Sequence, residues 1–227
     1  MCKRGEQNLQ NKSVILRGPR IALNRRGGYT PGMTRVAESV TLAVLRDIYQ
    51  RRQASYPEDA AYDFSALPSP DQMKGCLSAA QLLADAILGQ KDILIVGDYD
   101  ADGATATAVA MNVIQALEGQ VRFVVPNRFA YGYGLSVGLL ESILEQPPDL
   151  LMTVDHGIAC HEGIQRAKEA SLQVIVTDHH LPGETLPPAD VIVNPNQPGD
   201  TFPSRALSGV GVVFYVMMGL RQVLREQ

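Results

Sequence analysis

From residue 92 onward, short apolar runs alternate with longer stretches in which apolar side chains recur every three or four positions. Short β-branched runs are typical of buried strands, and the longer stretches are typical of helices that cover a sheet. The pattern predicts strands at 92–97, 121–125, 150–154, 172–177 and 191–193, and helices at 104–117, 136–145, 162–170 and from about 210 to the end. Such an alternation predicts the α/β class, with a parallel sheet of about five strands and helices on both faces.

The chain before residue 92 has a weaker pattern. Apolar positions at helical spacing predict a covering helix at 35–50 and a second helix at 76–88, which Gly89 closes. Three prolines within 56–70 indicate a loop or linker. We therefore expect three parts: a basic arm at 1–35, a helical covering segment with a linker at 36–90, and an α/β domain at 91–227.

Charge is spread unevenly along the 227 residues, whose net charge is −4. Residues 1–35 hold eight Lys or Arg and one Glu, so the remainder carries −11. We expect the basic arm to be disordered and solvated, with contact to nucleic acid as the alternative. The acidic remainder argues against a protein that binds DNA through a broad positive surface, although bound metal ions could supply positive charge locally.

The cysteines and the amino-terminal segment bear on the compartment. Cys2, Cys76 and Cys160 stand at no metal-binding or CxxC spacing and are odd in number, as expected for reduced thiols. The first residues lack the continuous apolar segment of a secretory signal, and no stretch reaches the roughly 20 apolar residues of a membrane span. We therefore expect a cytoplasmic protein.

Acidic and imidazole side chains follow three of the predicted strands. Because the carboxyl ends of parallel strands lie along one edge of a sheet, these side chains are expected to converge. Crowded carboxylates repel one another unless hard divalent cations neutralise them, and the added imidazoles suit Mn²⁺ or Mg²⁺. The candidates are Asp98, Asp100 and Asp102 after the first strand, Asp155 and His156 after the third, and Asp178, His179 and His180 after the fourth.

The GDYDADG run at 97–103 is also compatible with two simpler structures. An EF-hand calcium loop begins with alternating aspartates as well, but it needs a glutamate at its twelfth position, where this chain has Val109. A solvated polar turn would explain one strand end but not three, although Asp155 alone could cap a helix.

The stretch PNRFAYGYG at 126–134 combines one cation, three aromatic rings and flexible glycines. It could grip single-stranded nucleic acid, with the cation on a phosphate and a ring stacked on a base. It could equally be a glycine-rich turn whose aromatic rings fill a gap. The residues themselves leave both possibilities open.

The motifs DYDADG at 98–103, VDHG at 154–157 and TDHH at 177–180 resemble, in this order, those of the DHH phosphoesterase superfamily. Further stretches, VPNRFAYGYGLS at 125–136 and VNPNQPGDTFPS at 193–204, are similar to the single-stranded-DNA-specific exonucleases within it. The resemblance extends from about residue 36 to the end. It implies phosphodiester hydrolysis at two Mn²⁺ or Mg²⁺ ions, with 5′→3′ release of 5′-mononucleotides from single-stranded DNA in repair and recombination.

The resemblance also implies roles for individual residues. The implied metal ligands are Asp98, Asp100, Asp102, Asp155 and His179, with Asp98 as either a ligand or an acceptor that orients one. The implied catalytic groups are Asp155, which would bridge the two ions, His179, and His180, which would face the scissile phosphate. The implied substrate-binding residues are Arg128, Tyr131 and Tyr133. Single-stranded DNA is the implied partner, together with a helicase or a single-strand-binding protein.

The chain departs from the pattern of these exonucleases in three respects. Members usually carry an acidic residue where Ala130 and Tyr131 stand, and an asparagine in place of His156. They also continue with a further metal-binding aspartate, a second domain and an OB-type domain, so we expect this chain to be an amino-terminal catalytic portion with weak or no activity alone. Two alternatives to the exonuclease function are a DHH phosphodiesterase that acts on oligoribonucleotides or cyclic dinucleotides, and a non-catalytic DHH-like scaffold.

Overall fold

The computed structural model describes residues 35–51 and 66–226, with side chains from residue 43 onward in the first range. The basic arm expected at 1–35 lies outside these residues, apart from the start of helix α1 (Arg35–Arg51). This helix belongs to a different compact unit from the one that begins at Pro68. An ion pair of 3.0 Å joins Asp47 to Arg51 one helical turn later.

The second unit is built on a sheet of five parallel strands in the order β2-β1-β3-β4-β5. The strands are β1 (Asp92–Val96), β2 (Gln120–Val124), β3 (Leu150–Val154), β4 (Gln173–Thr177) and β5 (Val191–Val193). The order reverses beside β1, which pairs with both β2 and β3, and such a reversal opens a crevice at the carboxyl ends of the strands. The predicted fold class is confirmed.

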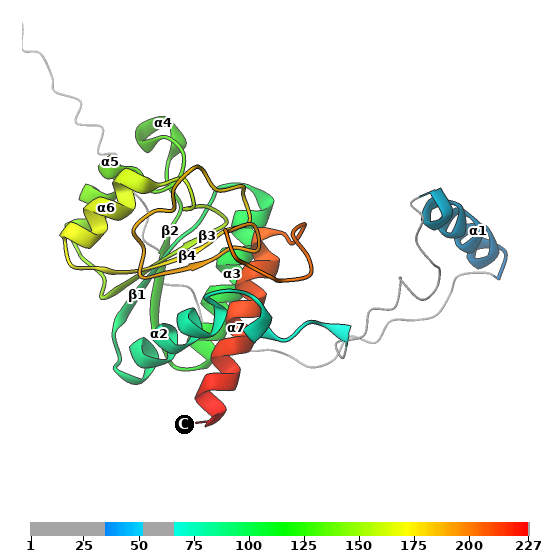
Figure 1. The fold of residues 1–227 in the computed structure, drawn as a ribbon, viewed down its shortest axis with the longest axis horizontal. Coiled ribbons are helices and arrows are strands. Elements are labelled where there is room, and N and C mark those ends of the chain that lie inside the picture. The colour runs from blue at the N-terminus through cyan, green and yellow to red at the C-terminus, as the bar shows by residue number, and fades with distance from the viewer. Residues whose placement is uncertain (1–34, 52–65, 227) are drawn as a thin grey trace, which may run out of the picture. The chain divides into compact units, whose positions relative to one another are not determined.

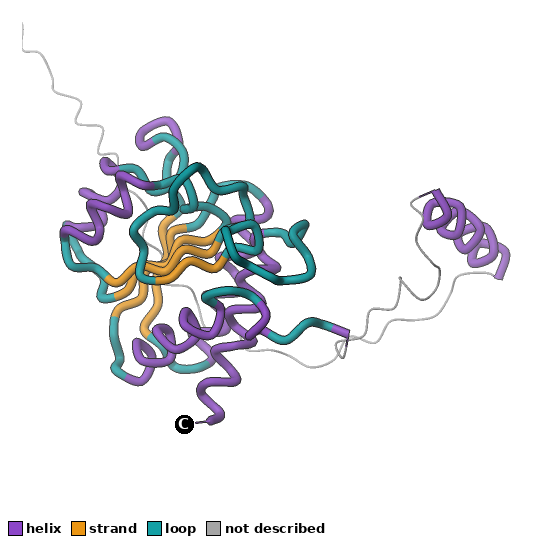
Figure 2. Tube along the Cα trace, in the orientation of Figure 1, coloured by secondary structure: helices purple, strands orange, loops and turns teal. Residues whose placement is uncertain are grey.

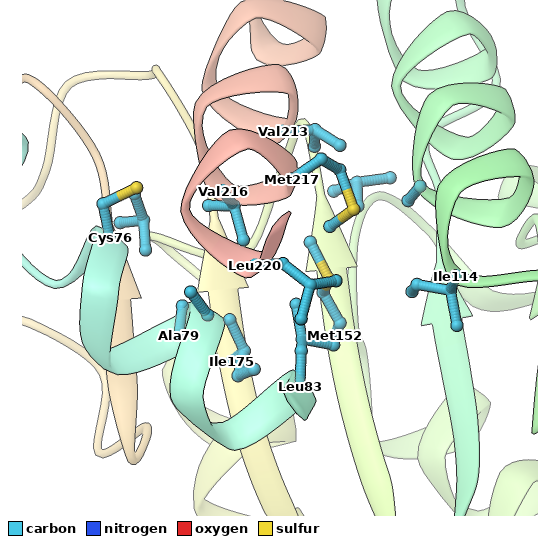
Figure 3. Packing of buried hydrophobic residues seen from close by; sticks show 14 of the residues in the cluster. Cys76, Ala79, Leu83, Ile114, Met152, Ile175, Val213, Val216, Met217 and Leu220 are labelled. Atoms are coloured by element: carbon cyan, nitrogen blue, oxygen red, sulfur yellow. The ribbon is translucent and has the colours of Figure 1, made fainter. Parts of the chain in front are cut away.

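The larger hydrophobic core lies on the face of the sheet covered by α2 (Cys76–Leu88), α3 (Ala101–Ala116) and α7 (Gly209–Glu226) (Figure 1). In Figure 3, Leu83 of α2 and Leu220 of α7 lie beside Met152 of β3, and all three are fully buried. Truncating a buried leucine of this kind to alanine costs about 2–5 kcal/mol. Helix α7 is therefore an integral part of the core.

The smaller core lies on the opposite face, under α5 (Val137–Leu144) and α6 (His161–Glu169). A one-turn helix, α4 (Arg128–Tyr131), lies in the stretch for which the sequence predicted no helix, and Asn127 caps it by accepting a hydrogen bond from the Phe129 amide. Loops (teal in Figure 2) continue the strands (orange) into the helices and, after β4, into β5. These loops carry the candidate site.

The described residues of the second unit begin before residue 91. Helix α2 packs against α7 and the sheet, and the unit that contains it begins at Pro68, where a short 3-10 helix, η3 (Pro70–Gln72), follows. The division at residue 91 stays a prediction. None of the helices in the described ranges is both long and apolar enough to cross a membrane.

Candidate metal centre

The loop after β1 forms a tight turn that fixes two carboxylates. Asp98 is 4% exposed and accepts a hydrogen bond of 2.7 Å from the Tyr99 amide. Asp100 caps α3 by accepting one of 2.9 Å from the Gly103 amide. A Cβ at Gly103 would collide with the backbone of Asp98, so only glycine permits this approach of helix to strand end.

Asp102 ties the site to the far end of the chain. Helix α3 begins at Ala101, three residues earlier than predicted, so Asp102 lies in its first turn. Its two carboxylate oxygens accept hydrogen bonds of 2.7 Å from the Gly209 amide and 2.8 Å from the Val210 amide, at the start of α7. A negative charge is stabilised there because the free amides and the helix dipole are positive.

Asp155, at the end of β3, is the most constrained carboxylate. Its backbone φ is +64°, a left-handed conformation that costs a non-glycine residue energy and is found at functional sites. Its side chain is 2% exposed, and Oδ1 accepts no well-formed hydrogen bond. Burial, together with the negative charges of Asp102 and Asp100, raises the pKa of Asp155 to about 7. A Cβ at Gly209 would collide with this carboxylate.

The turn after β4 is organised by Asp178, which the sequence placed among the candidates at the strand ends without a role of its own. Asp178 is 1% exposed, and Oδ1 accepts hydrogen bonds from the amides of His179 and His180, while Oδ2 accepts one of 2.9 Å from the Ile158 amide. Nδ1 of His180 lies 2.7 Å from the same Oδ1. Burial lowers the pKa of His180, but the hydrogen bond and charge of Asp178 outweigh it and raise the pKa above its ordinary value.

Two asparagines after β5 hold the histidines from the other side. Asn194 is fully buried and donates a hydrogen bond of 2.9 Å to the His180 carbonyl. The side-chain amide of Asn196 donates a hydrogen bond of 2.6 Å to the His179 carbonyl. The backbone amide of Asn196 donates one of 2.8 Å to Oδ1 of Asn194. The NPN motif at 194–196 was visible in the sequence, but nothing local indicated that it would meet the turn after β4.

These side chains converge on Asp155. Asp98, Asp100 and Asp155 form one group whose possible ligand atoms lie within 4.8 Å of one another, and Asp155, His179 and His180 form a second. Nε2 of His179 lies 3.1 Å from Oδ1 of Asp155 and 3.7 Å from Oδ2 of Asp102. Carboxylate oxygens with one or two imidazoles suit Mn²⁺ or Mg²⁺, and a buried carboxylate oxygen without a hydrogen bond is free to bind such a cation. The donor set therefore fits a divalent metal.

His156 does not join these groups. It is 1% exposed, neither ring nitrogen forms a well-formed hydrogen bond, and burial lowers its pKa, which favours the neutral ring. Its ring meets the edge of Tyr133 with centroids 6.4 Å apart.

The segment 126–134 places its side chains in different surroundings. The Arg128 guanidinium stacks on the ring of Tyr99, 4.0 Å from the centroid. Tyr133 is 53% exposed, and partial burial together with the nearby carboxylate of Asp98 raises the pKa of its phenol. Tyr131 packs against the smaller core, which matches the gap-filling explanation, whereas Phe129 is 95% exposed. The sequence indicated no individual role for Tyr99 or Phe129, because a glycine-rich loop has no periodicity that predicts which of its side chains are exposed.

Comparisons with known proteins agree with these features. Residues 92–227 match the DHH family, N-terminal domain. The chain is 44% identical over 193 residues to the single-stranded-DNA-specific exonuclease RecJ of Haemophilus influenzae, covering 84% of this chain and 34% of that protein. Identity to RecJ of Bacillus subtilis is 48% over 158 residues, covering 70% and 20%. The chain thus spans about a third or less of the length of these relatives.

Two solved structures are similar in fold. One is the crystal structure of exonuclease RecJ bound to manganese, with a TM-score of 0.62 and 39% identity, covering 70% of this chain and 39% of that one. The other is RecJ from Thermus thermophilus in complex with Mn²⁺, with a TM-score of 0.64 and 34% identity, covering 78% and 24%.

Proposed function

The chain belongs to the DHH family, and from this premise we propose that it is the catalytic portion of a metal-dependent 5′→3′ exonuclease acting on single-stranded DNA. The observation that carries the proposal is the position of Asp155, which belongs to both groups of possible metal ligands. A carboxylate shared between two groups can bridge two cations. Two adjacent divalent metal ions would polarise a phosphodiester, activate a water molecule and stabilise the leaving oxygen.

The residues around Asp155 divide into two proposed sites. Asp98 and Asp100 would hold one ion with Asp155, and Asp102 and His179 would hold the other with it. Asp102 would do so while still accepting hydrogen bonds from α7, because each carboxylate oxygen has more than one lone pair. The start of α7 therefore keeps this ligand in place.

His180 has a different proposed role, at the scissile phosphate. Asp178 engages Nδ1, which leaves Nε2 as the ring nitrogen available to a substrate, and half of the side chain is exposed. The raised pKa of His180 favours the protonated imidazolium, which donates to a phosphate oxygen. Asp178 would act through this histidine by orienting it.

The exposed aromatic and cationic side chains support single-stranded DNA as the substrate. Arg128 on Tyr99 and the exposed ring of Phe129 offer a cation and stacking faces beside the metal ligands. Bases stack on such rings irrespective of sequence. Tyr133 lies near the carboxylate of Asp98 and therefore near the proposed metal ligands. Tyr131 packs against the smaller core, which favours a structural role.

The proposal is tested by comparing 5′-phosphorylated single-stranded DNA, a linear dinucleotide, a cyclic dinucleotide and pyrophosphate as substrates. We expect slow release of mononucleotides from single-stranded DNA only, at high Mn²⁺ and low salt, because residues 36–227 carry −11 net charge and attract DNA poorly. Preference for either dinucleotide would favour the other DHH phosphodiesterases. Mn²⁺ binding without any hydrolysis, even after addition of the remaining portion of a full-length relative, would favour a non-catalytic scaffold.

A further inference from the structure

A cavity of about 600 Å³ adjoins the candidate metal centre on the side of α5 and α6. Its walls are Tyr133 and residues 135–137 before and at the start of α5, residues 157–163 leading into α6, and three residues of the turn after β4, namely Asp178, His180 and Leu181. Because His180 belongs both to this wall and to one group of possible metal ligands, the cavity opens directly beside the position proposed for the scissile phosphate.

The lining disfavours a second phosphate as the occupant. It contains no Lys or Arg, and its two carboxylates are those of Asp178 and Glu162. Of its two imidazoles, His161 and His180, the second is the one proposed to face the scissile phosphate. A second anion would therefore meet these negative charges without a Lys or Arg to compensate them. The remaining wall is largely apolar, with Leu135 and Ile158 fully buried behind it. A neutral, flat, partly apolar group suits such a wall.

The rim of the cavity carries apolar side chains that are open to solvent. Leu181, the residue directly after His180, is 80% exposed, and Tyr133 on the opposite segment is 53% exposed. Covering both with a flat ring would remove apolar surface from water, which favours binding. A volume of about 600 Å³ is within the range of about 300–1,000 Å³ that small-molecule sites occupy, so a nucleoside fits.

We propose that this cavity receives the base and sugar of the nucleotide whose phosphate would be bound by the metal ions at Asp155 and His179, beside His180. The inference rests on the proposed function and adds to it the site of the nucleoside. Because the wall offers mostly apolar contacts and no Lys or Arg, it would accept any of the four bases with similar affinity.

The test compares two ligands of the 227-residue chain in the presence of Mn²⁺: thymidine 5′-monophosphate and 2-deoxyribose 5-phosphate, which lacks the base. We expect the nucleotide to bind at least about tenfold more tightly in calorimetric titrations, because it alone fills the cavity. Leu181→Ala and Ala159→Trp should each reduce this preference to about threefold or less, the first by removing the rim and the second by filling the space. Both residues are exposed, so folding is preserved.

The control is Leu88→Ala, since Leu88 is 63% exposed on α2 and lines no part of the cavity. It should leave the preference unchanged, and all three variants should keep the Mn²⁺ affinity. Equal binding of the two ligands, or binding of neither while Mn²⁺ still binds, would overturn the nucleoside site but leave the metal centre standing. Failure of Mn²⁺ to bind the unmodified chain would instead overturn the proposed function.

Discussion

Aspartates lie at the amino ends of the strands, here called the amino edge of the sheet, and at their carboxyl ends, the carboxyl edge. The two groups of aspartates have different partners. At the amino edge, Asp92 pairs with Arg122 at 2.9 Å, and Asp190 pairs with Lys168 at 2.6 Å. At the carboxyl edge, the described residues include no Lys or Arg in an ion pair with Asp98, Asp100, Asp102, Asp155 or Asp178. Those carboxylates accept hydrogen bonds from backbone amides and side chains, and Oδ1 of Asp155 accepts none.

The difference shows how one fold separates stability from chemistry. A cationic side chain neutralises the carboxylate with which it pairs. Several carboxylates without such a side chain create a negative electrostatic potential, which attracts a cation from solution. The strained backbone of Asp155 belongs to the second edge.

The largest effect is expected from Asp155→Ala. Removing the carboxylate common to both groups of possible ligands should abolish binding of a pair of Mn²⁺ ions, as measured by calorimetry. The matched control is Asp190→Ala at the amino edge, which should leave the Mn²⁺ stoichiometry unchanged because its partner is Lys168. Unchanged stoichiometry and affinity in Asp155→Ala would mean that the assigned site is wrong.

The pH dependence of stability should reveal the same carboxylate in metal-free protein. The pKa of Asp155 is raised to about 7, so between about pH 4 and 7 the folded state keeps a proton that the unfolded state has released. Its contribution to the free energy of unfolding should therefore fall as pH rises, by up to about 1.4 kcal/mol per pH unit. Urea denaturation in EDTA should show a flatter profile for Asp155→Asn. Parallel profiles would contradict the prediction.

Comparison of His180→Ala with His179→Ala should separate the two histidines. We expect His180→Ala to lower turnover about 10²-fold or more with little change in Mn²⁺ affinity, because it faces the phosphate. His179→Ala should weaken Mn²⁺ binding itself, since Nε2 lies 3.1 Å from Oδ1 of Asp155. Equal loss of turnover and of metal affinity in His180→Ala would make His180 a ligand.

Asn194→Ala should have a moderate effect. It removes the fully buried side chain that pairs with the His180 carbonyl and with the backbone amide of Asn196, which costs about 1–3 kcal/mol of stability. The loosened turn should also weaken Mn²⁺ binding several-fold, measured on protein that is still folded. The control Gln222→Ala removes an exposed hydrogen bond to Glu226 and should change neither quantity. Lost stability with unchanged Mn²⁺ affinity would leave Asn194 a purely structural role.

The smallest effect on metal binding is expected from Arg122→Ala at the amino edge. The Arg122 side chain is 13% exposed and donates hydrogen bonds to Asp92 and to the Gln146 carbonyl, so the free energy of unfolding should fall by about 1–3 kcal/mol. Mn²⁺ binding should not change. A change in metal affinity would show that the two edges are coupled, which would break the contrast.

The sequence by itself determined the elements and their class, because strand and helix periodicities are local properties of the chain. Helix α2 and strand β3 begin and end at the predicted residues, and the parallel arrangement follows from their alternation with helices. The same rule predicted that Asp100, Asp155 and His179 would lie along one edge, although their roles stay predictions.

Only the tertiary structure decided which groups hold that edge together. Asp102 meets the amide of Gly209, 107 positions away, and Asn194 meets the carbonyl of His180 across a loop. Such contacts depend on how α7 packs against the sheet and how β5 pairs within it, and the local periodicity of apolar residues does not predict this. Exposure within segment 126–134 was equally undetermined, since a glycine-rich loop has no fixed spacing of buried positions, and only packing separated the partly buried Tyr131 from the exposed Phe129.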